Sequence, residues 1–298
     1  MTANILSIDG GGIRGVATLQ QLITLEKTLK APIHVHFDYI TGTSTGSIVA
    51  GLLSIGMNPK DILQLYQEHG EKIFKKRFWR LGLTQSKYKD EELNSALQDY
   101  TQGKLLRDSL TKLIIPAYNV SKRQIKLFKS YKDGNLYSLF DVVRASSAAP
   151  TFFDPWKING ETFVDGGLVA NNPSMVAIIE AMKDGYDTFN VMSFSTGPRE
   201  TALSDKDTKK GILGMASPTI DILLTEQSQM VDYTLGKLFE LGSIKGNYVR
   251  CETYLARASS EMDDASPCNL SKLIEDGEDS AVTNKNKMIQ FYNVSIKR

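Results

Sequence analysis

The stretch Asp38–Ser47, with the sequence DYITGTSTGS, carries an apolar strand signal that runs directly into a serine flanked by two glycines. Its second half fits the pattern G-x-S-x-G, in which Gly42 and Gly46 let a strand turn sharply into a helix. The apolar run that follows suits a buried helix. We therefore expect Ser44 to lie on a strained turn with its hydroxyl exposed, as a candidate nucleophile. An ordinary turn rich in glycine and serine fits the same five residues.

The composition is that of an ordinary soluble globular protein. The 298 residues are 41% hydrophobic and 23% charged, and 35 basic against 34 acidic side chains give a formal net charge of +1. So balanced a chain gives no support for general attraction to nucleic acid or to acidic membranes. Cys251 and Cys268 are too few for a disulfide framework, and we expect both to be unpaired and to hold no metal.

The N-terminus, MTAN, enters a strand signal directly, without the charged segment and long apolar stretch of a secretory signal. No window approaches the ~18 uninterrupted apolar residues of a membrane-spanning helix. We therefore expect a soluble, cytoplasmic protein, although export by a route without a signal peptide fits the same sequence.

A glycine-rich loop, Asp9–Gly15, separates the first expected strand at 4–8 from a helix expected at 16–29. Its glycines fit the G-x-G-x-x-G pattern of dinucleotide-binding loops. That fingerprint also expects an acidic residue at the end of the second strand, where the serine turn stands instead. The free N–H groups of such a loop can also form an oxyanion hole, and we favour this use. Arg14 either strengthens its positive field or is a solvated side chain.

Strand and helix signals alternate along the rest of the chain, which predicts one α/β domain over residues 1–298 with additional C-terminal helices. Asn159–Gly160 is a strong hairpin signal and puts Asp165 at the end of a strand. Asn172 is expected to cap the next helix and Pro173 to be its first residue. The other strands are expected at 113–118, 124–128, 188–195 and 248–252, and the other helices at about 59–74, 139–149, 212–241 and 282–292, with a polar, acidic segment at 258–280.

Two further segments bear on membrane contact and control. Phe78, Trp79, Leu81 and Leu83 form an apolar cluster among lysines and arginines, which suits either the edge of a core or a lip that faces lipid. The segment 199–210 is polar and is expected to be a surface loop. If the protein is a gated effector, this loop and the C-terminal segment are the natural places for its control.

A serine hydroxyl needs a base to take its proton, and the usual base is a histidine. The chain's histidines, His34, His36 and His69, all lie in the first quarter, whereas an α/β-hydrolase places its histidine well downstream of the serine. A carboxylate is the remaining candidate. Asp165 is the best one, because it is expected to end a strand and two glycines follow it.

Three motifs therefore occur in order: DGGGIRG at 9–15, GTSTG at 42–46 and DGG at 165–167. This arrangement resembles the patatin-like phospholipases, also called lipid acyl hydrolases, and the related cytosolic phospholipases A2. The resemblance covers about 4–200, which it marks as a catalytic core before a helical part at about 211–298. It implies a three-layer α/β/α sandwich with a mostly parallel central sheet. It also implies Ser44 as nucleophile, Asp165 as general base, and an oxyanion hole formed by Gly10, Gly11 and Gly12 with Arg14.

The activity implied by the resemblance is hydrolysis of fatty-acyl esters of phospholipids or lysophospholipids through an acyl-enzyme. It requires no cofactor or metal, and it involves transient contact with a membrane surface and no nucleic acid. Control by a protein or small-molecule activator is left open, because the family includes host-targeted toxins and nucleotide-activated phospholipases. Two alternatives remain: a gated membrane-binding effector with latent esterase activity, and a nucleotide-binding protein that uses the glycine loop.

Overall fold

The computed structural model of the chain describes residues 1–75, 86–133, 136–197 and 211–296. The apolar cluster expected at 78–83 and the polar loop expected at 199–210 lie outside these residues.

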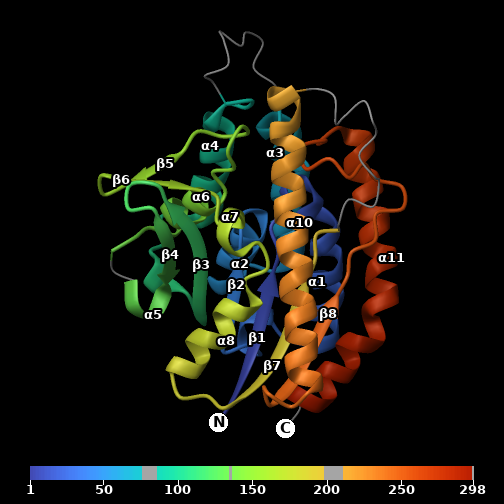
Figure 1. Cartoon of the computed structure of the whole chain (residues 1–298). Coiled ribbons are helices and arrows are strands. Elements are labelled where there is room, and N and C mark those ends of the chain that lie inside the picture. The colour runs from blue at the N-terminus through green and yellow to red at the C-terminus, as the bar shows by residue number, and fades with distance from the viewer. Residues whose placement is uncertain (76–85, 134–135, 198–210, 297–298) are drawn as a thin grey trace.

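The described residues form an eight-stranded sheet at the centre of the molecule (Figure 1). Five strands run parallel in the order β3-β2-β1-β7-β8, with bounds Lys112–Asn119, Tyr39–Gly42, Thr2–Ile8, Thr188–Phe194 and Gly246–Cys251. The antiparallel strands β4 (Gln124–Lys129) and β6 (Glu161–Val164) pair with β3, and β5 (Trp156–Ile158) pairs with β6. The sheet is therefore mostly parallel, as expected.

Helices cover both faces of this sheet. One layer contains α1 (Gly15–Leu29), α2 (Thr45–Ser54), α3 (Pro59–Ile73), α4 (Asp90–Thr101), α6 (Leu139–Ser146) and α11 (Pro267–Phe291). The opposite layer contains α8 (Ser174–Lys183) and α10 (Gly211–Glu240). Short elements complete the described chain: α5 (Ser130–Asp133), α7 (Gly167–Ala170), the 3-10 helices η1 (Gly12–Arg14), η2 (Ile33–Val35) and η3 (Leu106–Asp108), and the π-helix η4 (Tyr292–Ile296).

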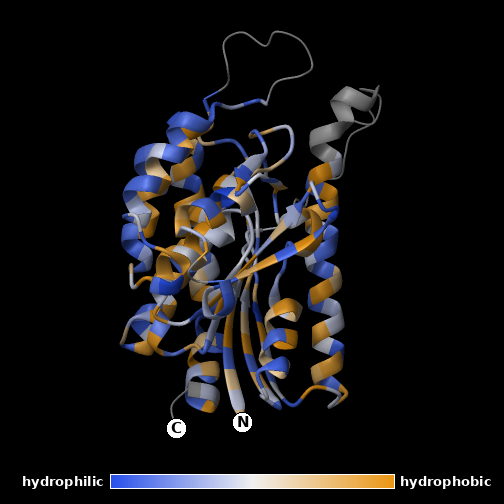
Figure 2. Ribbon diagram, turned by 90° about the vertical axis from the view of Figure 1, so that its left-hand side faces the viewer, coloured by the Kyte–Doolittle hydropathy of each residue, from blue (hydrophilic) through white to orange (hydrophobic). Residues whose placement is uncertain are grey.

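The central strands are buried on both faces because a helical layer covers each face of the sheet. Successive side chains of a strand point to opposite faces and so enter different cores. Ile5 and Tyr39 pack into the core beneath α8 and α10. Leu6 and Ile40, their neighbours in sequence, pack into the larger core beneath α1 and α2. Figure 2 shows the sheet between its two helical layers. The three-layer α/β/α sandwich implied by the resemblance is confirmed.

The last long helix begins earlier than its sequence suggests. Ser266 caps α11, and the helix runs from Pro267 rather than from about residue 282. Most of its charged residues lie on the exposed face, while Leu270 and Leu273 pack against the core. Four polar side chains of the helix are buried with them: Asn269, Asp276, Ser280 and Asn284. A Cβ atom on Gly277 would overlap the backbone of Ala17, so α11 lies directly against α1. The expected polar segment is therefore largely an amphipathic helix.

Smaller differences concern helix ends. Helix α6 ends at Ser146 instead of continuing to Ala149. Pro173 is the N-cap of α8 rather than its first residue, and the side chain of Asn172 accepts a hydrogen bond from the Ser174 N–H at 3.1 Å. Helix α4 was not expected from the sequence. The hairpin turn is confirmed, since Asn159 has φ 50° and Gly160 φ 81° between the antiparallel strands β5 and β6.

Among the described residues, no helix combines the length and apolar character needed to cross a membrane. Cys251 is buried and Cys268 is exposed, and both are unpaired, as expected.

The close packing of helix α2 on strand β1 predicts opposite effects for two Gly→Ala substitutions in helices. A Cβ atom on Gly46 would overlap the carbonyl oxygen of Ile8, whereas one on Gly236 in α10 would meet nothing within 4 Å. We expect Gly46→Ala to cost about 2 kcal/mol of stability and Gly236→Ala to add up to about 1 kcal/mol. Chemical denaturation of both variants measures the difference. Equal effects at the two sites would contradict this packing.

Candidate active site

Ser44 lies at the sharp turn between β2 and α2. Its backbone has φ 55° and ψ −124°, a conformation that a residue with a side chain rarely adopts. A Cβ atom on Gly42 would overlap the carbonyl group of Gly46, so the turn needs glycine on both sides of the serine. The hydroxyl of Thr43 also secures the turn by donating to the Ala170 carbonyl at 2.6 Å. The expected strand-to-helix turn is therefore present.

Asp165 follows strand β6 and is 3% exposed. Its Oδ1 atom accepts a hydrogen bond from the Gly167 N–H at 2.7 Å. Its Oδ2 atom is buried and has no hydrogen-bond partner of acceptable geometry within the described part of the chain. The hydroxyl of Ser44 is close enough to this carboxyl group to lower its pKa, and both residues line one pocket. The structure therefore brings together two side chains that are 121 positions apart in the sequence.

Ser146 links the segments that carry these two residues. Its hydroxyl accepts from the Ser44 N–H at 3.2 Å and donates to the Pro116 carbonyl at 2.7 Å. Its own carbonyl accepts from the Gly166 N–H at 3.1 Å. Sequence reasoning gave Ser146 no role, and only its place in a run of small residues marked it.

Burial raises the pKa of Asp165 to about 6, because the charged form loses its hydration. The Gly167 N–H, the Ser44 hydroxyl and the positive charge of Arg144 each oppose this rise. The carboxyl group is therefore ionised near neutral pH but is a much stronger base than an exposed aspartate.

The glycine loop passes next to Ser44, where a Cβ atom on Gly10 would lie 3.1 Å from the Ser44 Cβ. The Gly10 N–H donates to the Asn171 carbonyl at 3.2 Å. The N–H groups of Gly11 and Gly12 have no acceptor among the residues that the structure describes, and both glycines line the Ser44 pocket. Two of the three expected amides are thus available to a ligand, and the third is engaged.

Arg14 supports the loop from behind. Its side chain is buried, with Nε donating to the Gly11 carbonyl at 3.3 Å and Nη1 to the Ser260 carbonyl at 3.1 Å. Nη2 lies 3.4 Å from the carboxylate of Asp221. Arg14 is therefore no solvated side chain, and it lines a second, polar pocket rather than the pocket of Ser44.

The pocket beside Ser44 is apolar and holds about 740 Å³ of space, its open mouth included. The side chains that line it come from both helical layers and include Ile48, Leu65, Ile73, Phe74, Phe153 and Leu224. Such a lining favours apolar groups over charged ones.

The three histidines stand apart from this pocket, because none of them lines it. His34 and His36 lie at η2, before strand β2, and the ring of His69 on α3 packs edge-on against Tyr100. The described residues also contain no group of His, Cys, Asp and Glu side chains that could hold a metal ion.

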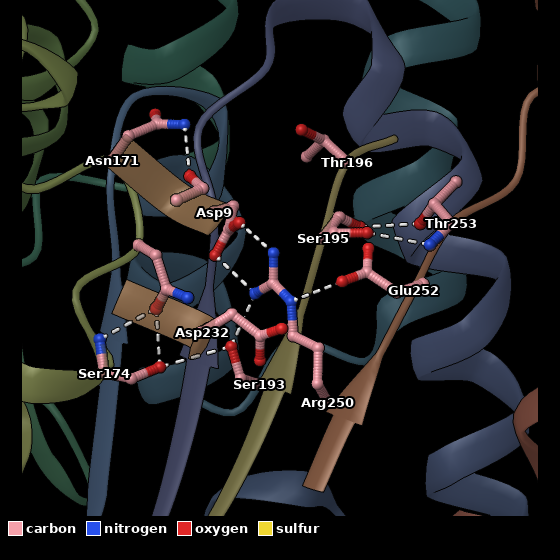
Figure 3. A network of polar contacts seen from close by, with 12 residues as sticks. Asp9, Asn171, Ser174, Ser193, Ser195, Thr196, Asp232, Arg250, Glu252 and Thr253 are labelled. Carbon is pink, nitrogen blue, oxygen red and sulfur yellow. Dashed lines mark hydrogen bonds and ion pairs between the residues drawn. The ribbon is translucent and has the colours of Figure 1, made fainter. Parts of the chain in front are cut away.

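A network of polar contacts lies behind the glycine loop (Figure 3). Arg250 on β8 binds both carboxylate oxygens of Asp9, at 3.0 and 2.6 Å, and also donates to the Ser193 hydroxyl at 2.7 Å. Burial raises the pKa of Asp9, while Arg250 opposes the rise. The pair ties the end of β1 to β7 and β8. Sequence reasoning did not find Arg250, because nothing in its local pattern points to Asp9.

Comparison with known sequences identifies the class of protein to which this fold and this pocket belong. The family model described as patatin-like phospholipase matches residues 6–178, more than half of the chain. The chain belongs to the patatin-like phospholipase family, a family of lipid hydrolases.

Individual relatives extend the likeness to nearly the whole chain. Patatin-like protein 1 of Arabidopsis thaliana is 31% identical over 92% of this chain and 80% of its own length. A cGAMP-activated phospholipase of Vibrio cholerae serotype O1 is 27% identical over 99% of this chain and 95% of its own length. The crystal structure of VipD from Legionella pneumophila shares the fold, with a TM-score of 0.53 and 13% identity over 96% of this chain and 67% of that one.

The raised pKa of Asp165 predicts a pH-dependent gain in stability for Asp165→Asn. Because its pKa is 3.8 when exposed and about 6 when folded, ionisation opposes folding increasingly between pH 4 and pH 6. At about 1.36 kcal/mol per pKa unit, we expect the variant to be more stable by about 3 kcal/mol at pH 8 and by roughly 1 kcal/mol at pH 4.5. Urea denaturation at the two pH values tests this, and an equal gain at both would contradict it.

Proposed function

We propose that this protein is a lipid acyl hydrolase in which Ser44 is the nucleophile and Asp165 the general base. One observation carries the proposal: a serine on a strained turn and a buried carboxyl group of raised pKa line the same apolar pocket. The family membership supports the reaction class. The position of all three histidines away from the pocket favours a carboxylate over an imidazole as the base.

In the proposed reaction, Asp165 accepts the Ser44 proton while the Ser44 oxygen attacks the ester carbonyl carbon. Negative charge develops on the carbonyl oxygen and is stabilised by the free N–H groups of Gly11 and Gly12. Asp165 then returns the proton to the departing alcohol, leaving an acyl group on Ser44. A water molecule gives its proton to Asp165, attacks the acyl-enzyme and releases the fatty acid.

The proposed oxyanion hole therefore contains fewer residues than the resemblance implies. The Gly10 N–H already donates to Asn171, so we assign the two donors to Gly11 and Gly12. Arg14 is assigned a supporting role, because its guanidinium group contacts the Gly11 carbonyl and Asp221 rather than the pocket.

The pocket supports the proposed substrate class. Its aliphatic and aromatic lining suits the acyl chain of a phospholipid or lysophospholipid, so the ester carbonyl would lie at Ser44 and the headgroup toward the mouth. Such a substrate resides in a membrane, and we propose transient contact of the protein with the membrane surface. We also propose that residues 1–298 act as one catalytic unit, since β8 belongs to the same sheet as β1.

A small-molecule activator is part of the proposal. Support comes from the V. cholerae relative, which is a cGAMP-activated phospholipase and matches 99% of this chain. Hydrolysis assays should therefore be run with and without a cyclic dinucleotide, so that a dormant enzyme is not mistaken for an inactive one.

Removing the nucleophile should abolish hydrolysis without unfolding the protein. We expect Ser44→Ala to lower kcat on phospholipid vesicles by at least about 10³-fold, because the acyl-enzyme cannot form. Ser54→Ala is the matched control, since Ser54 lies at the other end of α2 and does not line the pocket of Ser44. Its hydroxyl donates to the Gly51 carbonyl at 2.7 Å and lies 3.2 Å from the Ser109 hydroxyl. Mass spectrometry of the released lipids measures both. Unchanged fatty-acid release by Ser44→Ala would refute the proposed mechanism.

The same mechanism predicts an acidic limit to activity. Asp165 accepts a proton only when ionised, so kcat/KM should fall about tenfold per pH unit below its pKa of about 6 and level off above it. A pH profile with a soluble p-nitrophenyl ester measures this. A profile that stays flat between pH 4.5 and pH 7 would exclude Asp165 as the base.

A further inference from the structure

The peptide bond between Gly10 and Gly11 joins two environments. Among the described residues every peptide bond is trans, so the Gly10 carbonyl and the Gly11 N–H point in opposite directions from one rigid plane. Gly11 lines the apolar pocket of Ser44, whereas Gly10 lines the polar pocket behind the loop. Whatever fixes the carbonyl of Gly10 therefore also fixes the direction of the Gly11 N–H.

Two side chains hold that carbonyl. The hydroxyl of Thr196 donates to it at 2.7 Å, and the Nδ2 of Asn171 approaches it at 3.5 Å. Asn171 makes shorter hydrogen bonds elsewhere, to the Leu224 carbonyl at 3.0 Å and the Ser228 hydroxyl at 2.9 Å. Thr196 thus supplies the main hydrogen bond, and Figure 3 shows the two residues on either side of Asp9.

Thr196 is itself firmly placed. It follows strand β7, is 4% exposed, and lies so close to the loop that a Cβ atom on Gly11 would overlap its hydroxyl. The strand that precedes it, β7, is held to β8 in part by Arg250, which binds Ser193 and Asp9. A rigid strand therefore presents a hydroxyl to the back of the loop.

We propose that Thr196 is a positioning residue of the oxyanion hole: by holding the Gly10 carbonyl, it keeps the Gly11 N–H directed toward Ser44. This inference rests on the proposed function. Without the hydroxyl, the carbonyl would keep only the long contact to Asn171, and the peptide plane would be free to rotate away from the geometry that stabilises the oxyanion. Thr196 touches no reacting atom, and it lies beyond the segment 6–178 that the family model matches.

Thr196→Val tests the proposal, because it removes the hydroxyl and keeps the shape. Deleting an oxyanion donor costs about 10² to 10³-fold in kcat, so misdirecting one should cost between about 10-fold and 100-fold. KM on a p-nitrophenyl acyl ester should stay within about twofold of wild type. Thr196→Ser, which retains the hydroxyl, should restore most of kcat.

Thr18→Val is the matched control. Thr18 is equally buried, and its hydroxyl donates at 2.9 Å to the carbonyl of Ser195, the residue next to Thr196. We expect this variant to lose similar stability and to keep its kcat. If Thr196→Val and Thr18→Val retain the same kcat, Thr196 has only a structural role and the inference is overturned. Should Thr196→Val fail to fold, the ratio of kcat between Thr196→Ser and Thr196→Ala decides in its place.

A second measurement separates this inference from the proposed function. An alkyl fluorophosphonate reacts with an activated serine: the Ser44 oxygen bonds to phosphorus, fluoride leaves and the hydroxyl proton passes to Asp165. Intact-protein mass spectrometry gives the rate, which Thr196→Val should lower by the same factor as kcat. A wild-type protein that neither hydrolyses acyl esters nor reacts at Ser44 overturns the proposed function and the inference with it. If the wild-type protein reacts at Ser44 and the Thr196→Val variant reacts at the same rate, the inference is overturned and the proposed function stands.

Discussion

The close approach of two backbones, at the start of helix α2 and the end of strand β1, is the constraint on which the site depends. It requires glycine at 46, since any Cβ there would overlap the Ile8 carbonyl, and it forces Ser44 into a positive φ. The unfavourable turn is retained because the surrounding sheet fixes it from both sides. Its result is that the serine and the glycine loop, which follow neighbouring strands of the parallel sheet, face one another across a few ångströms.

The same region contains a carboxyl group whose burial is costly for folding. A carboxyl group buried at Asp165 with one oxygen lacking a complete hydrogen bond is unfavourable for folding, yet burial is what makes it a stronger base. The buried pair of Asp9 and Arg250 behaves differently, because both carboxylate oxygens are satisfied. The two aspartates that begin the DGGG and DGG motifs are therefore alike in burial and differ in their partners, because only Asp9 faces a guanidinium group that binds both of its oxygens.

Local patterns predicted much of this molecule and failed where contacts are long-range. The central strands, the serine turn, the hairpin before Asp165 and the α/β class all follow from periodicity and turn residues within short windows. The start of α11 was missed because its apolar face is narrow within an acidic stretch. Ser146, Thr196 and Arg250 were missed for a different reason: each acts on a residue more than 100 positions away, and a hydrogen bond of that kind leaves no trace in local spacing.

Strand β8 brings the C-terminal third of the chain into the architecture of the site. The recognisable family segment ends at residue 178, before β7 and β8, yet the cation that neutralises Asp9 comes from β8. A fragment cut at that boundary would leave a carboxylate at the base of the glycine loop without its counter-charge, and the central strand β1 without a neighbour on one edge. A domain exchanged between relatives would accordingly have to include β7 and β8, although the family is recognised from residues 6–178 alone.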